Sequence, residues 1–263
     1  PYDHRPAEEG RDFRGATVRR RLDAGTVTRL RDVAARKRTT LSNLVLTSFA
    51  AALWQASRQD DFCIGMSIAN RSHADLESLI GFFVNILAIR FEAGAQTTLS
   101  DLLDTTIASV YEAFDHQEYP FDRLVRRLNP DRVANRQPFV NVVYGFQNFV
   151  DVQAGAAPRA PAAGLDAVGS FAVPYRTSKF DLCLFATEVG DGVLFELEYD
   201  LALFTETTIA RLLDGIAAAA ERLGSDAGAT IGSLTRGDID ERDASAALAA
   251  LNATSTGYPR EAT

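Results

Sequence analysis

The sequence predicts an α/β (α+β) domain, a two-layer sandwich in which helices cover a mixed β-sheet. Three observations support this prediction. Short strand-like apolar stretches alternate with longer segments whose apolar residues recur at helical spacing. Two strand-like segments flank Gly190-Asp191-Gly192, which is typical of an antiparallel hairpin. The 263 residues are enough to bury a sizeable core, as one domain or as two small lobes.

The first part of the chain predicts two helices between two strands. Residues 16–22 and 62–69 have strand patterns. A helix is expected over 26–37, because its apolar residues lie on one face. The next helix begins after Thr39 or Thr40, either of which can cap it. Its apolar residues surround it, so burial on more than one side is expected.

The stretch from Ile80 to Arg90 predicts a buried strand of nearly unbroken apolar residues. Asn85 interrupts it on a face that otherwise consists of large apolar side chains. A buried amide without hydrogen-bond partners costs on the order of a few kcal/mol. We therefore expect Asn85 to meet a polar group, a water molecule or a ligand, and a purely structural amide is the alternative.

The rest of the chain continues the alternation of helices and strands. Pro120 is well placed for the first turn of a short helix, because its fixed φ suits that position. The remaining expected elements are an amphipathic helix at 99–114, the short helix after Pro120, a strand at 139–149, a loop-like segment at 150–168, hairpin strands at 180–187 and 193–199, and an amphipathic helix at 205–223.

Composition excludes several classes of function. The net charge of -8 argues against a nucleic-acid surface, which needs clustered cations. The basic runs at 19–21 and 36–38 are expected to be solvated faces. Cys63 and Cys183 are too far apart in sequence to indicate a metal site, and both are expected to be small buried hydrophobes. Without a signal peptide or an apolar run of about 18 residues, a cytoplasmic protein with no membrane partner is expected.

Three motifs follow one another at a distinctive spacing. The first is the stretch 80–90. The second, 116–122, is His-Gln-Glu-Tyr-Pro-Phe-Asp, and the third, 132–139, is Arg-Val-Ala-Asn-Arg-Gln-Pro-Phe. In order and spacing they resemble the later signature motifs of the condensation domains of nonribosomal peptide synthetases. The flanking stretches 61–71 and 179–200 agree with the same family.

The resemblance can be followed residue by residue. Ile86 stands where the family usually has threonine, and Val133 and Asn135 replace an aspartate and a serine of the third motif. The residues that match the family pattern are Gly81, Asn85 and Arg90 in the first motif, His116, Gln117, Pro120 and Phe121 in the second, and Arg136 and Pro138 in the third.

This resemblance implies a chloramphenicol-acetyltransferase-like fold, in which two lobes form a V. Pantetheine arms of two carrier proteins enter a tunnel between the lobes, and the acceptor amine attacks the donor thioester to form an amide. The family's His-His-x-x-x-Asp-Gly motif is absent, since His4, His73 and His116 have no histidine neighbour. The resemblance thus implies a C-terminal half-domain that has no catalytic residue, metal or cofactor of its own and should be inactive alone.

The resemblance also implies candidate sites. Tyr119 and Phe121 are expected near the docking surface of the acceptor carrier, with plain packing as the alternative. Residues 150–178 are expected to include the segment that crosses to the other lobe. The candidates for lining the tunnel are Asn85, Phe83, Ser67 and Asn70.

The expected organisation is an extended lead-in at 1–15, a lobe at 16–225, and a tail at 226–263 that leads toward an adenylation domain. One more helix can lie within 230–251. The expected partners are the N-terminal lobe and the donor and acceptor peptidyl carrier proteins, which supply the phosphopantetheine. One alternative is a non-catalytic module that docks carrier proteins or tailoring enzymes. Another is an acyltransferase of the same fold from a different pathway, which would need its own histidine motif.

Overall fold

The computed structural model describes residues 2–4, 12–76, 78–128, 139–147 and 176–234. The strands are β1 (Gly15–Leu22), β2 (Asp61–Ile68), β3 (Asn85–Glu92), β4 (Val142–Gln147), β5 (Leu182–Val189) and β6 (Gly192–Asp200). The helices are α1 (Ala24–Lys37), α2 (Leu41–Ser57), α3 (Leu99–Asp115), α4 (Phe121–Leu128) and α5 (Glu206–Ser225), with short 3-10 turns at Ala74–Leu76 and Ile231–Ser233.

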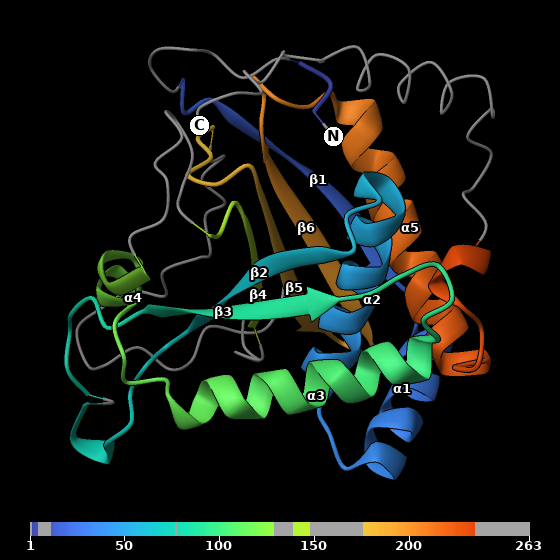
Figure 1. The fold of residues 1–263 in the computed structure, drawn as a ribbon, viewed down its shortest axis with the longest axis horizontal. Helices are drawn as coiled ribbons and strands as arrows, with labels where there is room; N and C mark the ends of the chain where they lie inside the picture. The colour runs from blue at the N-terminus through green and yellow to red at the C-terminus, as the bar shows by residue number, and fades with distance from the viewer. Residues whose placement is uncertain (1, 5–11, 77, 129–138, 148–175, 235–263) are drawn as a thin grey trace, which may run out of the picture.

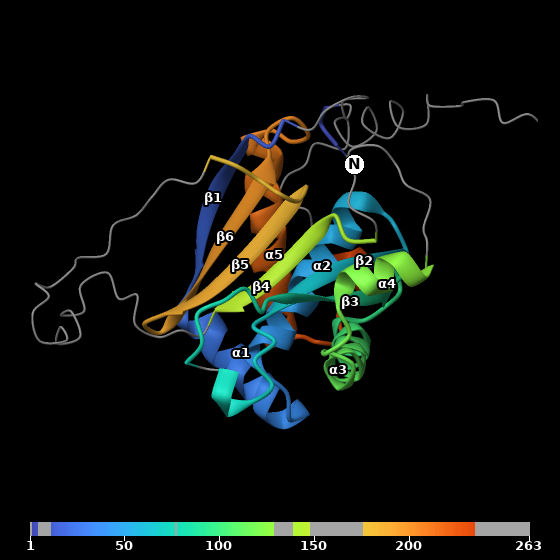
Figure 2. The same ribbon diagram turned by 90° about the vertical axis from the view of Figure 1, so that its left-hand side faces the viewer.

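The six strands form one mixed sheet in the order β1-β6-β5-β4-β2-β3 (Figure 1). β4 lies parallel to both β2 and β5, and the other neighbours are antiparallel. β5 and β6 form the predicted hairpin, and Gly190 takes a positive φ in its turn, where a glycine is favoured. In Figure 2 the strands lie in front and α2 and α5 lie behind them. The predicted two-layer α/β fold is confirmed.

α2 is the central helix of the covering layer. Thirteen of its 17 residues are buried, which confirms the expected burial on several sides. Thr40 precedes its first residue, and the Thr40 hydroxyl accepts a hydrogen bond from the backbone N–H of Asn43. Thr39 instead accepts from the side-chain amide of Asn43. Thr40 is therefore the cap, and α2 packs between α3 and α5 under the sheet.

The predicted strand at 80–90 is wrong in its first half, because β3 begins only at Asn85. Residues 80–84 form an exposed loop in which Ile80 and Phe82 are 105% and 91% exposed. β2 ends at Ile68, which pairs with Asn85, and Asn70 then takes a left-handed conformation. Residues 80–84 consequently have no opposing residue of β2 with which to pair.

The sheet face away from the main core holds a smaller apolar cluster. Val140, Val143 and Cys183 are buried there, and half-buried aromatic rings pack against them. Gly65 lies beneath this cluster, where an added Cβ would collide with Val140 and lie 2.9 Å from Ile86 Cγ2. Close packing on this face therefore depends on the absence of a side chain at Gly65.

β1 forms one edge of the sheet and carries three consecutive arginines. Arg19 Nε donates to Glu196 Oε1 of β6 at 2.7 Å, and Arg21 Nη2 donates to Asp191 Oδ1 at 3.1 Å. Arg20 pairs with Asp214 of α5. The run at 19–21 is thus exposed, as expected, and its cations pair with acidic groups of neighbouring elements.

The packed body continues past residue 225, the expected end of the lobe. Ile231 is fully buried, and Thr230 forms a β-bridge with Thr98. The Gln55 side chain donates to the carbonyls of Ile231 and Leu234 at 3.2 and 2.6 Å. Residues 226–234 are therefore part of the fold.

Several expectations lie outside the described residues: residues 132–138 of the third motif, which include Arg136 and Pro138, the loop-like segment at 150–168, residues 150–175 of the segment expected to cross to the other lobe, and the tail after 234. Within the described residues, no helix is both long and apolar enough to cross a membrane.

Candidate functional site

The candidate site lies at the corner of the sheet where β2 ends and β3 begins. Ser67 lies opposite Ile86, one position from the Ile68–Asn85 pair. Asn70 follows β2 by two residues, and Phe83 precedes β3 by two residues. The fold therefore brings all four tunnel-lining candidates to one corner, although the sequence separates them by up to 18 positions.

Asn85 is buried at this corner, and its amide is fully engaged. Its Nδ2 donates to the carbonyl oxygens of Gln117 and Tyr119 at 2.9 and 3.0 Å. Its Oδ1 accepts from the backbone N–H of Phe121 at 3.1 Å. The expected polar neighbour is thus the backbone of the second motif, so Asn85 links the first two motifs directly.

Residues 116–120 form the turn between α3 and α4. The His116 N–H donates to the carbonyls at the end of α3, and the His116 carbonyl accepts from the Tyr119 N–H at 3.0 Å. The Pro120 carbonyl accepts from the N–H groups of Arg123 and Leu124 in the first turn of α4. The helix begins one residue after Pro120, close to the predicted position.

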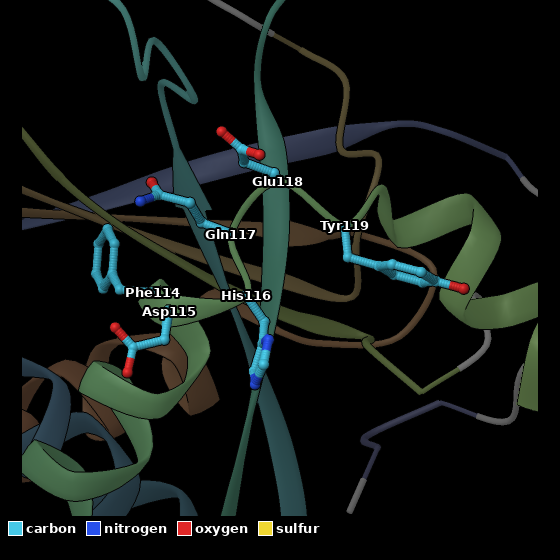
Figure 3. Close-up of a pocket in the computed structure, with 6 residues that line it drawn as sticks. All are labelled: Phe114, Asp115, His116, Gln117, Glu118 and Tyr119. Carbon is cyan, nitrogen blue, oxygen red and sulfur yellow. The ribbon is translucent and has the colours of Figure 1, made fainter.

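A shallow hollow of about 320 Å³ lies along this turn and is lined by residues 114–119 (Figure 3). His116 is exposed, and Figure 3 shows its ring and the Glu118 carboxylate pointing to different sides of the turn. Tyr119 extends away from the other lining side chains and is 48% exposed. Tyr119 is thus available to a partner, whereas Phe121 is half-buried against the smaller apolar cluster.

Arg71 holds the loop before β3 and was missed as a site residue by the sequence analysis. Its Nη1 donates to the carbonyl of Leu76, and its guanidinium carbon lies 4.4 Å from the ring centroid of Phe83. A cation over an aromatic face is favourable. The only sequence signal was its place in the flanking stretch 61–71.

The same loop exposes a run of large apolar side chains, which we call the apolar loop strip. Its members are Leu79, Ile80, Phe82 and Val84, each at least 48% exposed. Exposed apolar patches on soluble domains often mark interaction sites. Gly81 lies within the strip, where an added Cβ would lie 2.9 Å from the Phe83 ring.

α4 stands beside the start of β3, apart from α1, α2 and α5 (Figure 1). None of its residues is buried. Arg123, Arg126 and Arg127 are exposed on it, and only Arg126 has an ion pair among the described residues, with Asp122. Three arginines within the eight residues 121–128 are the sequence signal that predicts this basic surface.

Ser67 lies on the sheet face away from the main core. Its hydroxyl donates to the carbonyl of Tyr144 at 3.3 Å. Farther along this face, burial and, to a lesser extent, the nearby Glu198 carboxylate together raise the pKa of the Cys183 thiol to about 12. Burial likewise raises the pKa of Glu198. Cys183 is buried as expected and Cys63 only half-buried, and no metal-binding cluster of His, Cys, Asp and Glu occurs among the described residues.

Sequence comparisons identify relatives among large peptide synthases. The family model described as Condensation domain matches residues 1–239. The chain is 37% identical over 243 residues to chondramide synthase cmdD of Chondromyces crocatus, a match that covers 92% of this chain and 6% of that protein. It is 32% identical over 263 residues to surfactin synthase subunit 1 of Bacillus subtilis (strain 168), covering 98% of this chain and 7% of that protein. The chain thus spans a small fraction of these relatives.

Solved structures agree. The fold matches holo-AB3403, a four-domain nonribosomal peptide synthetase, with a TM-score of 0.80 and 20% identity over 92% of this chain and 19% of that one. It matches the X-domain from teicoplanin biosynthesis with a TM-score of 0.77 and 26% identity over 89% of this chain and 52% of that one. From its sequence and its fold, the chain belongs to the condensation domain family.

Proposed function

We propose that this chain is the C-terminal lobe of an amide-forming condensation domain in a nonribosomal peptide synthetase. In the proposed reaction the acceptor amine attacks the donor thioester carbonyl, a C–N bond forms, and the C–S bond breaks to release the pantetheine thiol. The amine proton leaves to a base, which we assign to the histidine motif of an N-terminal lobe. The chain itself contains no adjacent histidines.

The observation that carries the proposal is the apolar loop strip beside the linked motifs. Ile80 and Phe82 are almost fully exposed, three to five residues before the buried Asn85. An N-terminal lobe packed on this corner would remove these side chains from water, which stabilises the pair of lobes. In a two-lobe assembly, Ser67, Asn70, Phe83 and Asn85 would then lie near the tunnel that separates the lobes.

The basic face of α4 and the exposed Tyr119 support docking of the acceptor carrier on the same side. Arg123, Arg126 and Arg127 favour an acidic partner surface, and Tyr119 offers an aromatic anchor of the kind that is enriched at interfaces. In this arrangement the phosphopantetheine arm belongs to the carrier, and this chain guides its entry.

The test compares amide formation with and without the missing lobe. Donor and acceptor carriers, each loaded with an aminoacyl thioester, are incubated with this chain alone and with a polypeptide that adds the His-His-x-x-x-Asp-Gly lobe. Mass spectrometry of the released product is expected to show an amide only in the second mixture. Amide from the chain alone would overturn the proposal and direct attention to His116.

A second candidate function is a non-catalytic docking module. The observation that favours it is the 26% identity to the X-domain from teicoplanin biosynthesis, which also forms a solved complex with OxyB. If the two-lobe mixture binds loaded carriers but forms no amide, the docking role is the better assignment.

A further inference from the structure

We propose that Asn85 is a positioning residue for the docking surface formed by Tyr119 and α4, and that it acts through the backbone of residues 117–121. This inference rests on the proposed function, because it assigns the surface to an acceptor carrier. It concerns how the sheet fixes that surface, and it requires no contact between Asn85 and substrate.

The geometry supports a fixed link between the sheet and the turn. Asn85 is the first residue of β3 and pairs with Ile68 of β2, so its backbone belongs to the sheet. Its three side-chain hydrogen bonds reach 32 to 36 residues along the chain and contact every second residue from 117 to 121. Asn85 is only 8% exposed, so water competes little for these bonds.

Apart from the Asn85 hydrogen bonds, α4 makes few packing contacts with the rest of the fold. The helix has eight residues and none is buried. Phe121 packs only half-buried against the smaller apolar cluster, and α4 has few close approaches to β3. An isolated helix of this length is marginal in water. The orientation of α4 and of the adjacent Tyr119 therefore depends strongly on the Asn85 bonds.

The chemistry of the amide explains why asparagine suits this position. The turn presents two carbonyl oxygens and one N–H group, so the partner must donate twice and accept once. Aspartate keeps the acceptor for Phe121 but places a charged oxygen against two carbonyl oxygens. Alanine leaves all three backbone groups without this partner, at a cost that is highest for buried groups.

The experiment uses the full chain with three single substitutions. Asn85→Ala removes all three side-chain hydrogen bonds. Asn85→Asp keeps the bond from the Phe121 N–H and is the variant to measure if Asn85→Ala does not fold. Gln55→Ala is the matched control, because Gln55 is another amide that is 8% exposed and donates to two carbonyls, but it holds residues 231–234. Each variant is measured for amide hydrogen exchange over 117–121, affinity for an aminoacylated holo peptidyl carrier protein, and Tm.

We expect both Asn85 variants to exchange faster over 117–121 and to bind the carrier about tenfold more weakly. Gln55→Ala should lower Tm comparably while leaving carrier affinity and exchange at 117–121 unchanged. Unchanged exchange in the Asn85 variants, or an equal loss of affinity in Gln55→Ala, would overturn the inference. If the unsubstituted chain binds no carrier, the docking part of the proposed function fails, and the exchange data still decide whether Asn85 positions the turn.

Discussion

Arg90 and Asp61 bind each other across β2 and β3 through two hydrogen bonds, Nε to Oδ1 at 2.9 Å and Nη2 to Oδ2 at 2.8 Å. Glu92 also pairs with Arg90, at 2.8 Å. The arginine lowers the pKa of the Asp61 carboxyl, and the two carboxylates raise the pKa of Arg90. Arg90, one of the residues that match the first motif, thus links the edge strand β3, which begins with Asn85, to its neighbour β2.

This ion pair predicts a contribution to acid sensitivity. The folded pKa of Asp61 lies below its ordinary value of 3.8, so the pair stabilises the folded state above that value and is lost as pH falls through the folded pKa. Asp61→Asn should therefore lower neutral stability slightly and weaken the pH dependence below about pH 4. Urea unfolding across pH checks this, and 1 M NaCl should shrink the neutral difference. If the free energy of unfolding falls equally steeply below about pH 4 in the unsubstituted chain and in Asp61→Asn, the prediction is wrong.

Gly65→Ala should destabilise the fold by about 1–3 kcal/mol, because a Cβ there collides with Val140 and crowds Ile86. Gly94→Ala is the control, since no atom lies within 4 Å of a Cβ built at Gly94. Urea unfolding measures both. Combining Gly65→Ala with Val140→Ala should cost less than the sum of the two single changes. If the two changes in the free energy of unfolding simply add, contact with Val140 is not the reason why a side chain at position 65 is unfavourable.

Tyr119→Ala should weaken carrier binding with little change in Tm, because the side chain is exposed and extends away from the turn. Tyr111→Ala is the matched control, with a similarly exposed tyrosine (52%) on α3. Dissociation constants by calorimetry, with unfolding curves, separate the two effects. We expect a loss of about fivefold or more for Tyr119→Ala. Equal affinities for the two variants would remove Tyr119 from the docking surface.

Cys183 should resist alkylation in the folded protein. Burial raises the pKa of its thiol to about 12, and only the thiolate reacts readily. At pH 8 iodoacetamide is expected to modify Cys63 slowly and Cys183 only after unfolding in urea. Peptide mass spectrometry reports the modification at each site. Rapid modification of Cys183 without denaturant would show that this sheet face opens readily.

Helix and strand positions could largely be predicted because burial imposes a period on the sequence. α2 illustrates this: its apolar residues recur on several sides, and the helix is buried on several sides. The strand at 80–90 was overextended because hydrophobicity alone does not reveal a pairing partner. Pairing stops at Ile68, and the apolar residues before Asn85 are exposed.

The candidate site was only partly predictable for a related reason. The sequence identified Asn85 as a polar residue that needs partners. Its partners are the carbonyls of residues 117 and 119 and the N–H of residue 121. Every residue has a backbone carbonyl and every residue except proline has a backbone N–H, so the side-chain sequence does not reveal which backbone groups are the partners. Arg71 over Phe83 likewise depends on how the loop folds back.

The three arginines of β1 also affect how this protein behaves at high concentration. Among the described residues, β1 forms a ladder only with β6, so its other edge faces away from the sheet. Addition of a strand from another molecule would desolvate guanidinium groups that already have acidic partners at Glu196, Asp214 and Asp191. Charged edge strands discourage such pairing. The arginines therefore protect the β1 edge of the sheet against edge-to-edge aggregation.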